Sequence, residues 1–357
     1  MKIAVISTYP PDECGIGIYT KNLVEALLKS GATVEVITFQ GYNYTDKYVK
    51  PILRKNSLGT YVQAANYIKR NNFDRILIQH EFPFYNIFYF QVMLLLLKLS
   101  GKKVNVTIHT IPPYTDFFKK SAIRILHSVI LFFSDQIILH TNYARKKLVK
   151  STFIMKPVRI MHIPVNKSVL KPQKILPKKK VNVLCFGFIG YEKGLDIACE
   201  ALGGLRNVKL TIAGRVHPRF VAQQSAFLGK IKDYARKFRN IKLINSFIPD
   251  KQKISLFRKC DFVLLPYIFI EQSAVLTEAW SYYKIPICSN IPAFLEELEG
   301  ETYGINFKSE NPAELRKTIL KIASDVDKQR SILKNIGRIN KERSFESIAK
   351  RYLRELV

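Results

Sequence analysis

The sequence is poor in cysteine and in long apolar runs. Its five cysteines are scattered and never form a CxxC pair. They are Cys14, Cys185, Cys199, Cys260 and Cys288. This pattern argues against a disulfide framework or a structural zinc site and favours a reducing compartment. The longest apolar run, residues 87–97, contains Gln91 and has about half of the roughly 20 residues that a membrane span needs. Because residues 1–7 have the pattern of a buried strand, we expect no secretory signal and a cytoplasmic protein.

Acidic residues are also scarce. Lys plus Arg total 57 against 28 for Asp plus Glu, which gives a formal net charge of +29. Such an excess attracts polyanions, namely nucleic acid, an anionic membrane face or phosphorylated small molecules. Because the lysines are spread along most of the chain, an unusual surface composition without a dedicated partner is the alternative. Charge alone does not choose among these.

The chain has 357 residues, of which 47% are hydrophobic, so we expect a globular protein of two domains. Short segments rich in Val and Ile alternate with segments of helical length, first in residues 1–165 and again in residues 181–340. The expected strands are residues 2–7, 33–39, 74–81, 104–110, 135–141, 158–163, 181–187, 208–214, 241–246, 261–267 and 285–290. Strands that alternate with helices predict parallel sheets covered on both faces. The predicted fold class is therefore α/β, with two Rossmann-like domains and a linker at residues 166–180, which hold two prolines and a lysine run.

Ligands of open parallel sheets bind beyond the carboxyl ends of the strands, so motifs at these ends are the candidates for chemistry. The first strand runs into YPPDECGIGIYT, where Gly15 and Gly17 precede a helix N-terminus that suits an anion. A dinucleotide fingerprint fails there because Thr20 stands at its third glycine position. A tight strand-to-helix turn is the alternative.

Two histidines follow strands in the first half. QHEF (79–82) and TIHT (107–110) place His80, Glu81 and His109 where they could face one crevice. A lone histidine is more often structural than catalytic. Two histidines at strand ends in one domain raise the weight of a catalytic role. No metal-ligand spacing is present, so we expect no metal site.

The second half carries a glycine-rich turn after a strand. FGFIGYEKGLD (186–196) holds Gly187 and Lys193, but lacks the GK[ST] ending of a P-loop. A lysine beside backbone donors suits a diphosphate. A solvated lysine in a turn is the alternative.

The segment PYIFIEQSAVLTEAWSYYKIP (266–286) gives the strongest signal. Gln272 and Ser273 open a predicted helix in which Glu278 lies among apolar residues. An ionised carboxylate in such a setting needs a partner. Either it forms a salt bridge to one of the many lysines, or it accepts hydrogen bonds from ribose hydroxyls while the helix start faces phosphate.

Together these motifs resemble glycosyltransferase family 4, a large group of retaining GT-B enzymes. The resemblance spans nearly the whole chain and includes YPPxxCGIGxYT, QHEF, TIHT, HIP (162–164), FGFIxxxKGLD and QSAVLTEA. It implies the GT-B fold, in which the two sheets face each other across a cleft. SFESIAKRYL (344–353) is similar to the helix that crosses back onto the first domain, which we expect within residues 341–357.

The resemblance also implies roles for individual residues. Lys193 binds the donor diphosphate, and His109 lies near the transferred sugar; these two are the expected catalytic residues. Glu278 matches the second glutamate of the family's E-x7-E pattern, which holds the ribose. The remaining donor-binding positions are backbone groups or glycines of the loops around the diphosphate, namely Gly15, Gly17, Gly187, Ser273 and Ala274.

The sequence departs from the family pattern at two points. The first family glutamate falls at Ile270, or at Phe269 in a related variant, while Glu271 is out of register. The arginine that usually accompanies the lysine falls at Phe188 or Gly190, and Arg215 is a candidate replacement. These gaps suggest altered donor handling or, as an alternative, a catalytically weakened protein that binds nucleotide sugars or glycans.

The expected function is transfer of a hexose from a nucleotide sugar to a glycan or polyprenyl-linked sugar acceptor in surface polysaccharide or glycoprotein glycan assembly. We expect no cofactor and no nucleic-acid partner, and a sugar-nucleotide epimerase or phosphorylase on the same fold is a rival. FFKKSAIRILHSVILFF (117–133) mixes Lys119, Lys120 and Arg124 with apolar residues. Such a stretch suits an anionic membrane surface on the inner face, and a core helix with a basic end is the alternative.

Overall fold

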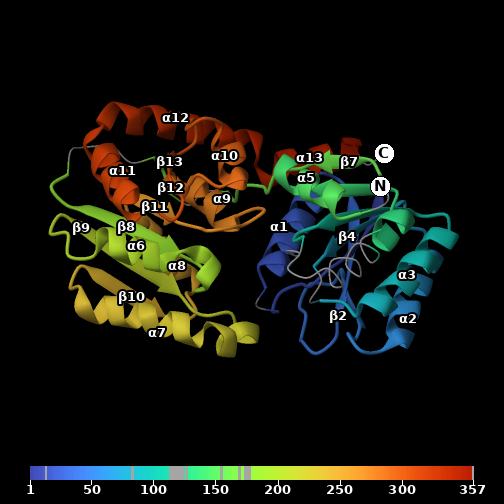
Figure 1. Ribbon diagram of the computed structural model, residues 1–357. Coiled ribbons are helices and arrows are strands. Elements are labelled where there is room, and N and C mark those ends of the chain that lie inside the picture. The colour runs from blue at the N-terminus through green and yellow to red at the C-terminus, as the bar shows by residue number, and fades with distance from the viewer. Residues whose placement is uncertain are drawn as a thin grey trace. The chain divides into compact units, whose positions relative to one another are not determined.

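In the computed structural model the chain forms two compact units (Figure 1). The N-terminal unit comprises Met1–His162 and Phe345–Val357, and the C-terminal unit comprises Ile163–Ser344. The structure describes residues 1–12, 14–81, 84–111, 125, 128–152, 156–167, 170–172 and 178–355. The expected linker at 166–180 lies partly outside these ranges. Lys119, Lys120 and Arg124 of the predicted membrane-facing stretch lie outside them entirely.

The N-terminal unit is built on a parallel sheet with the strand order β3-β2-β1-β4-β5-β6-β7. The strands are β1 (Lys2–Ile6), β2 (Thr33–Phe39), β3 (Val49–Leu53), β4 (Arg75–His80), β5 (Lys103–Ile108), β6 (Gln136–Leu139) and β7 (Val158–Ile160). The helices are α1 (Gly15–Lys29), α2 (Leu58–Arg70), α3 (Ile87–Leu99), α5 (Asn142–Lys150) and α13 (Phe345–Glu355).

Alternate residues of β1 enter different cores, because successive side chains of a strand point to opposite faces of the sheet. Ile3 and Val5 pack with α1 and α13, whereas Ala4 and Ile6 pack with α2 and α3. The sheet is therefore covered by helices on both faces, as its Val- and Ile-rich strands predict.

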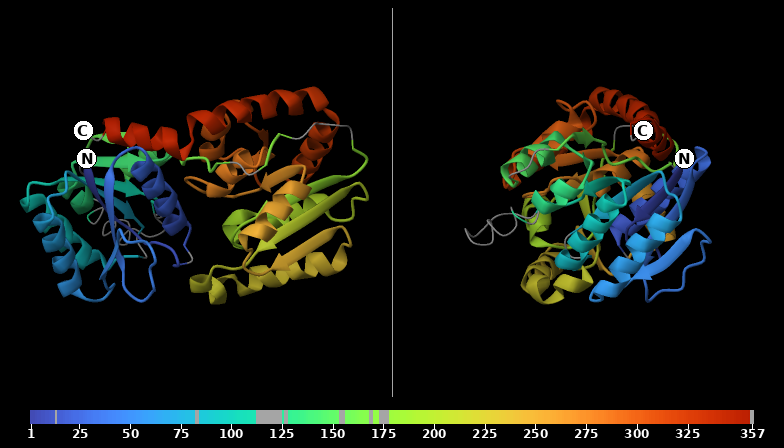
Figure 2. Two further views of the ribbon diagram at one scale, coloured as in Figure 1. Left: turned by 180° about the vertical axis from the view of Figure 1, so that it is seen from behind. Right: turned by 90° about the vertical axis from the view of Figure 1, so that its right-hand side faces the viewer.

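The C-terminal helix α13 belongs to the N-terminal unit, where it lies alongside α1 (Figure 2). It buries Ile348, Ala349 and Tyr352 against the core, and the Tyr352 hydroxyl lies 3.3 Å from the Tyr19 hydroxyl of α1. The last residues of the chain thus complete a core that its first residues begin.

The C-terminal unit has a second parallel sheet, with the order β10-β9-β8-β11-β12-β13. The strands are β8 (Val181–Phe186), β9 (Val208–Gly214), β10 (Ile241–Asn245), β11 (Phe262–Leu265), β12 (Ile285–Ser289) and β13 (Ile305–Phe307). The α-helices are α6 (Leu195–Leu202), α7 (Val221–Lys237), α8 (Asp250–Lys259), α9 (Ala274–Ser281), α10 (Pro292–Leu298), α11 (Pro312–Ser324) and α12 (Val326–Glu342).

The predicted α/β class with two Rossmann-like parallel sheets is confirmed. The sequence did not predict β3 and β13, which both lie at the edge of a sheet. β3 contains Pro51 and pairs with β2 alone, and β13 has three residues, so neither has the long apolar pattern of a central strand. No helix in the described part of the chain is long and apolar enough to cross a bilayer.

Candidate active site

Two neighbouring strand ends meet closely in the C-terminal unit. Gly187 follows β8 with a φ of +110°, and its N–H donates to the Ala213 carbonyl at the end of β9. Gly214 has a φ of +150°, and a Cβ added there would lie 1.8 Å from the carbonyl oxygen of Gly187. Only glycine fits at Gly214, so the two backbones can approach at the edge where ligands of parallel sheets bind.

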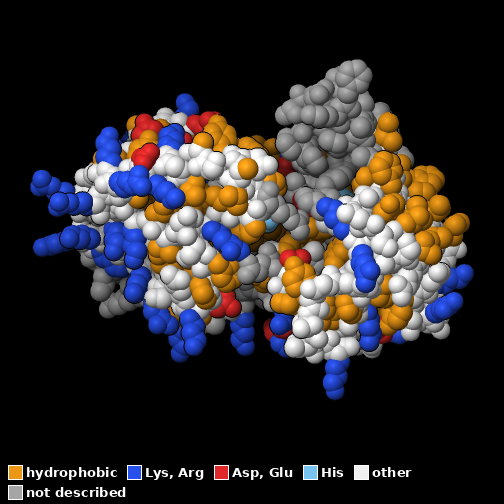
Figure 3. Space-filling model, turned by 90° about the horizontal axis from the view of Figure 1, so that it is seen from below, with side chains coloured by type: hydrophobic (Ala, Val, Ile, Leu, Met, Phe, Trp, Pro, Cys, Tyr) orange, Lys and Arg blue, Asp and Glu red, His pale blue; other side chains and the backbone are white. Residues whose placement is uncertain are grey.

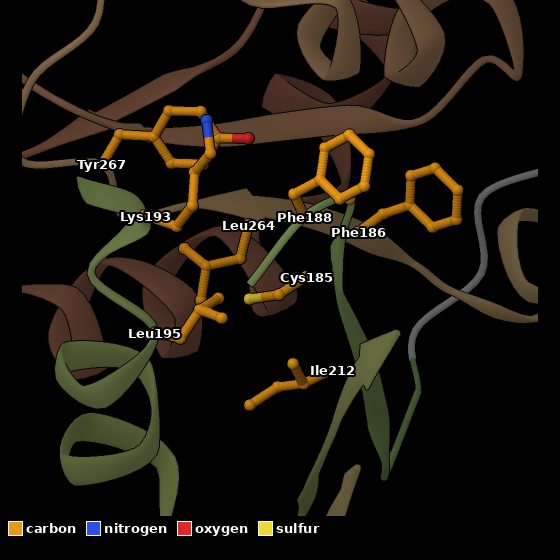
Figure 4. A pocket seen from close by; sticks show the side chains of 9 residues that line it. Cys185, Phe186, Phe188, Lys193, Leu195, Ile212, Leu264 and Tyr267 are labelled. Atoms are coloured by element: carbon orange, nitrogen blue, oxygen red, sulfur yellow. The ribbon is translucent and has the colours of Figure 1, made fainter. Parts of the chain in front are cut away.

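Lys193 is held over an aromatic ring by the next turn. It ends the 3-10 helix Tyr191–Lys193, and Gly194 follows in the left-handed conformation, where a Cβ would lie 2.0 Å from the Pro266 carbonyl oxygen. The turn is thereby pressed against the segment after β11, and Lys193 Nζ lies 4.2 Å from the centre of the Tyr267 ring (Figure 4). This is a cation–π contact, with Glu192 Oε1 4.0 Å away.

The Lys193 side chain is 19% exposed, and burial lowers its pKa while Glu192 opposes the change. The cavity beside it has a volume of about 10 Å³, and its lining includes Gly187. Lys193 and Tyr267 also line it (Figure 4). Such a volume holds about one water molecule. A charged ammonium with few solvent contacts is poised to gain from a bound anion.

The N-terminus of α9 lies against the Gly187 turn. Ser273 caps the helix, and its hydroxyl accepts a hydrogen bond from the Leu276 N–H at 3.3 Å. A Cβ on Gly187 would lie 3.3 Å from Val275, in the first turn of α9. The fold therefore brings Gly187, Lys193, Ser273 and the exposed Ala274 to one edge, where the helix start offers N–H groups and partial positive charge.

Glu278 lies one turn further along α9 and is largely buried. Lys253 of α8 donates a hydrogen bond to its Oε1 at 3.2 Å. Its Oε2 is buried and has no hydrogen-bond partner among the residues that the structure describes. Burial raises the pKa of Glu278, and Lys253 opposes the rise. The carboxylate thus keeps one oxygen that a ligand hydroxyl would satisfy.

Arg215 follows β9, next to the turn that holds Phe188 and Gly190, the two positions at which the family arginine is expected. Its carbonyl accepts a hydrogen bond from the Ile189 N–H at 2.9 Å. Its guanidinium carbon lies 5.5 Å from the centre of the Phe247 ring. The backbone bond places Arg215 beside Ile189, in the turn where the family arginine is expected.

In the N-terminal unit, His109 follows β5 and is 6% exposed. Its Nε2 lies 2.8 Å from Oε1 of Gln79 at the end of β4, so Nε2–H donates to this amide oxygen. The rings of His140 and Tyr19 lie 5.0 and 5.3 Å away, centre to centre. Burial, followed by the charges of His140 and His80, holds the pKa of His109 well below its usual range. The imidazole is therefore neutral at pH 7.

Gly15 and Gly17 lie in the first turn of α1. A Cβ on Gly15 would meet nothing within 4 Å, and one on Gly17 would meet the Tyr9 backbone at 3.5 Å, an ordinary contact. Packing within the N-terminal unit therefore does not demand glycine at either position.

Two family models match consecutive parts of the chain. Residues 14–168 match "Glycosyltransferase Family 4", and residues 166–339 match "Glycosyl transferases group 1". The chain is a glycosyltransferase of the GT-B type. The family resemblance predicted from the motifs is thereby confirmed.

Solved structures share the glycosyltransferase's fold along its whole length. Sucrose-phosphate synthase from Thermosynechococcus elongatus is 16% identical, with a TM-score of 0.78 and 100% and 99% of the two chains covered. HepE from Anabaena, in complex with UDP-glucose, is 14% identical with a TM-score of 0.74 and the same coverage. The apo form of the lipopolysaccharide outer core galactosyltransferase WaaB is 14% identical with a TM-score of 0.68, again with 100% and 99% covered. Comparison with curated proteins gave no match.

Three residues that contact the predicted site residues carried no clear signal in the sequence. Lys253 is one lysine among many and stands 25 residues from Glu278. Gln79 and Tyr267 belong to quoted motifs, QHEF and P-Y, but nothing indicated that they contact His109 and Lys193. Only the packing of separate elements in the folded glycosyltransferase reveals these contacts.

Proposed function

We propose that this glycosyltransferase is a retaining hexosyltransferase that uses a nucleoside-diphosphate sugar. The observation that carries the proposal is the buried Glu278 carboxylate, with one oxygen bound to Lys253 and the other without a partner in the described part of the chain. A ribose hydroxyl would donate to that oxygen. The diphosphate would then lie toward the start of α9, Gly187 and Lys193. Retention of configuration rests on the resemblance to family 4.

In the proposed reaction the bond between the anomeric carbon and the diphosphate breaks, and negative charge develops on the leaving group. Lys193 and the N–H groups at the start of α9 stabilise this charge, and their fixed positions make the stabilisation effective. We assign the second cation to Arg215, because the family arginine is expected at Phe188 or Gly190 and neither residue is basic. The acceptor hydroxyl attacks from the same face and passes its proton to an oxygen of the departing diphosphate as the new bond forms.

His109 of the N-terminal unit has a separate proposed role. Because it is neutral and donates from Nε2 to Gln79, its ring is fixed in one orientation. In the proposed role it contacts the transferred sugar without adding positive charge. Gly15 and Gly17 would admit the diphosphate to the N-terminus of α1.

The proposed acceptor is a glycan or lipid-linked sugar at the cytoplasmic face of a membrane. The fold is shared with a lipopolysaccharide galactosyltransferase, which supports such an acceptor as a candidate. The net charge of +29 supports peripheral association with an anionic surface.

The test is release of free nucleoside diphosphate from a panel of sugar nucleotides, with UDP-glucose and UDP-galactose first because UDP-glucose is named with the HepE structure. We expect release from at least one donor, increased by a lipid-linked acceptor. Donor binding in calorimetry without any release would instead support the alternative, a nucleotide-sugar binding protein. The departures at Phe188 and Ile270 are what favour that alternative.

A further inference from the structure

Five basic side chains line a shallow hollow on the C-terminal unit, away from the strand ends that carry the candidate site. The hollow lies between α7 and the edge strand β10 and has a volume of about 560 Å³. The basic residues are Lys209 of β9, Lys232 and Arg236 of α7, Arg239 of the following turn and Lys242 of β10. All five are exposed. Figure 3 shows Lys and Arg side chains gathered over this side of the unit.

The positive charge of this basic hollow is largely uncompensated. Among the residues that the structure describes, no acidic side chain lines it. Arg236 pairs with Asp233 at 3.2 Å, whereas the other four basic residues form no ion pair with the described residues. Like charges held this close repel each other, and a bound polyanion relieves that repulsion. Protection of an edge strand by lysine accounts for Lys242, but not for Lys232 and Arg239 outside the strand.

The side chains that line the basic hollow favour an anionic lipid surface over a nucleic acid. The other lining residues are Ala235, Ile241 and Leu243, so no aromatic ring in the described part of the chain lines the hollow. Single-stranded nucleic acids are bound largely by stacking on aromatic side chains in addition to charge. A bilayer of anionic lipids needs only an exposed group of cations and no stacking. None of the three apolar lining residues is exposed, which fits contact with headgroups rather than insertion into the hydrocarbon.

We propose that the basic hollow docks the enzyme on an anionic lipid bilayer. The inference deepens the proposed function and rests on it in one respect, the lipid-linked acceptor that brings the enzyme to a membrane. The contact is electrostatic, so it is reversed by salt. Each basic residue close to an anionic surface strengthens binding about fivefold.

The test compares two triple variants with the same change in charge. The hollow variant is Lys209→Ala, Lys232→Ala and Lys242→Ala. The control is Lys317→Ala, Lys321→Ala and Lys334→Ala on α11 and α12, where the three lysines are also exposed and form no ion pair with the described residues. Both are sedimented with phosphatidylcholine vesicles, with and without phosphatidylserine, at low and at physiological ionic strength. Thermal unfolding checks that both variants are folded.

We expect the wild type to bind only vesicles with phosphatidylserine and to be released by salt. The hollow variant should bind roughly 100-fold more weakly, and the control within about threefold of wild type. Equal losses in both variants would show a diffuse effect of net charge and overturn the hollow as the docking surface. A wild type that binds RNA or an acidic polysaccharide but no vesicle would overturn the lipid partner.

Nucleoside diphosphate release with a water-soluble acceptor should be unchanged in the hollow variant. Failure of the docking surface is therefore separable from failure of the proposed transfer.

Discussion

At the scale of single residues, Lys193 is held where its own charge is costly. Burial lowers its pKa, and among the described residues its ammonium contacts the Tyr267 ring and a single carboxylate, that of Glu192 at 4.0 Å. A group so placed stabilises an anion strongly because water does not compete for it. We expect Lys193→Ala to reduce kcat by about 100- to 1000-fold, the range for removing one preorganised donor. Nucleoside diphosphate release measures this effect.

The control for this prediction is Lys317→Ala, which removes an exposed lysine of α11. It should leave kcat unchanged, and both variants should unfold within a few degrees of the wild type. Turnover of Lys193→Ala within a few-fold of the wild type would remove Lys193 from the mechanism.

His109 makes stability depend on pH. Its pKa is lowered in the folded protein, where it faces His140 and His80, the Tyr19 ring and the Gln79 amide. As pH falls below about 6.5, the unfolded chain takes up a proton that the folded protein excludes, so the free energy of unfolding decreases. The loss approaches about 1.4 kcal/mol per pH unit. His109→Asn does not titrate, so its unfolding midpoint should depend less on pH between about 7 and 5.5. His217→Asn in the C-terminal unit is the control, and an unchanged pH dependence in His109→Asn would contradict the prediction.

The candidate site residues fall into two groups, those that local sequence motifs single out and those that only the packing of separate elements reveals. The sequence singles out Lys193, Glu278 and the glycines as candidates because each stands in a local motif at the end of a strand or the start of a helix. Lys253 and the contact between Gln79 and His109 were not predictable, since they join residues 25 and 30 positions apart through the packing of separate elements. No local pattern encodes which of many lysines reaches a given carboxylate.

At the scale of elements, the close approach of β8 and β9 depends on Gly214. A side chain there would clash with the Gly187 carbonyl, and its φ of +150° is strained for other residues. We expect Gly214→Ala to destabilise the protein by about 1–3 kcal/mol or more and to weaken donor binding by displacing the Gly187 turn. Gly229→Ala is a matched control inside α7, where an added Cβ meets nothing within 4 Å. It should raise stability by about 1 kcal/mol. If the two variants changed the free energy of unfolding in urea equally, the close approach of Gly214 to the Gly187 carbonyl would not contribute to stability.

Element patterns also show where prediction from sequence succeeds. Central strands such as β1, β4 and β8 were predicted because both of their faces are buried, which requires continuous apolar residues. The edge strands β3 and β13 were missed because their residues need not be apolar on both faces. The family motifs predict a site at the ends of such central strands, and that position stays a prediction.

At the scale of the whole molecule, the C-terminal helix completes the N-terminal core. Tyr352 of α13 is 1% exposed and contacts Tyr19 of α1, more than 300 positions away in the chain. Tyr352→Ala removes a large buried ring, so it should destabilise the N-terminal unit by about 3–5 kcal/mol. Tyr352→Phe removes only the hydroxyl and should cost about 0.5–1.5 kcal/mol.

The single tryptophan makes this effect separable by unit. Trp280 is buried in the C-terminal unit, where its Nε1–H donates to the Tyr303 carbonyl at 2.8 Å, so tryptophan fluorescence monitors that unit alone. In urea, Tyr352→Ala should shift the part of the far-ultraviolet circular dichroism transition that arises from the N-terminal unit and leave the fluorescence midpoint near the wild-type value. Equal shifts of both signals would show that the two units unfold as one and contradict the prediction. An unchanged circular dichroism transition would contradict the helix's role in the core, because a buried ring of this size cannot be removed from a packed core without cost.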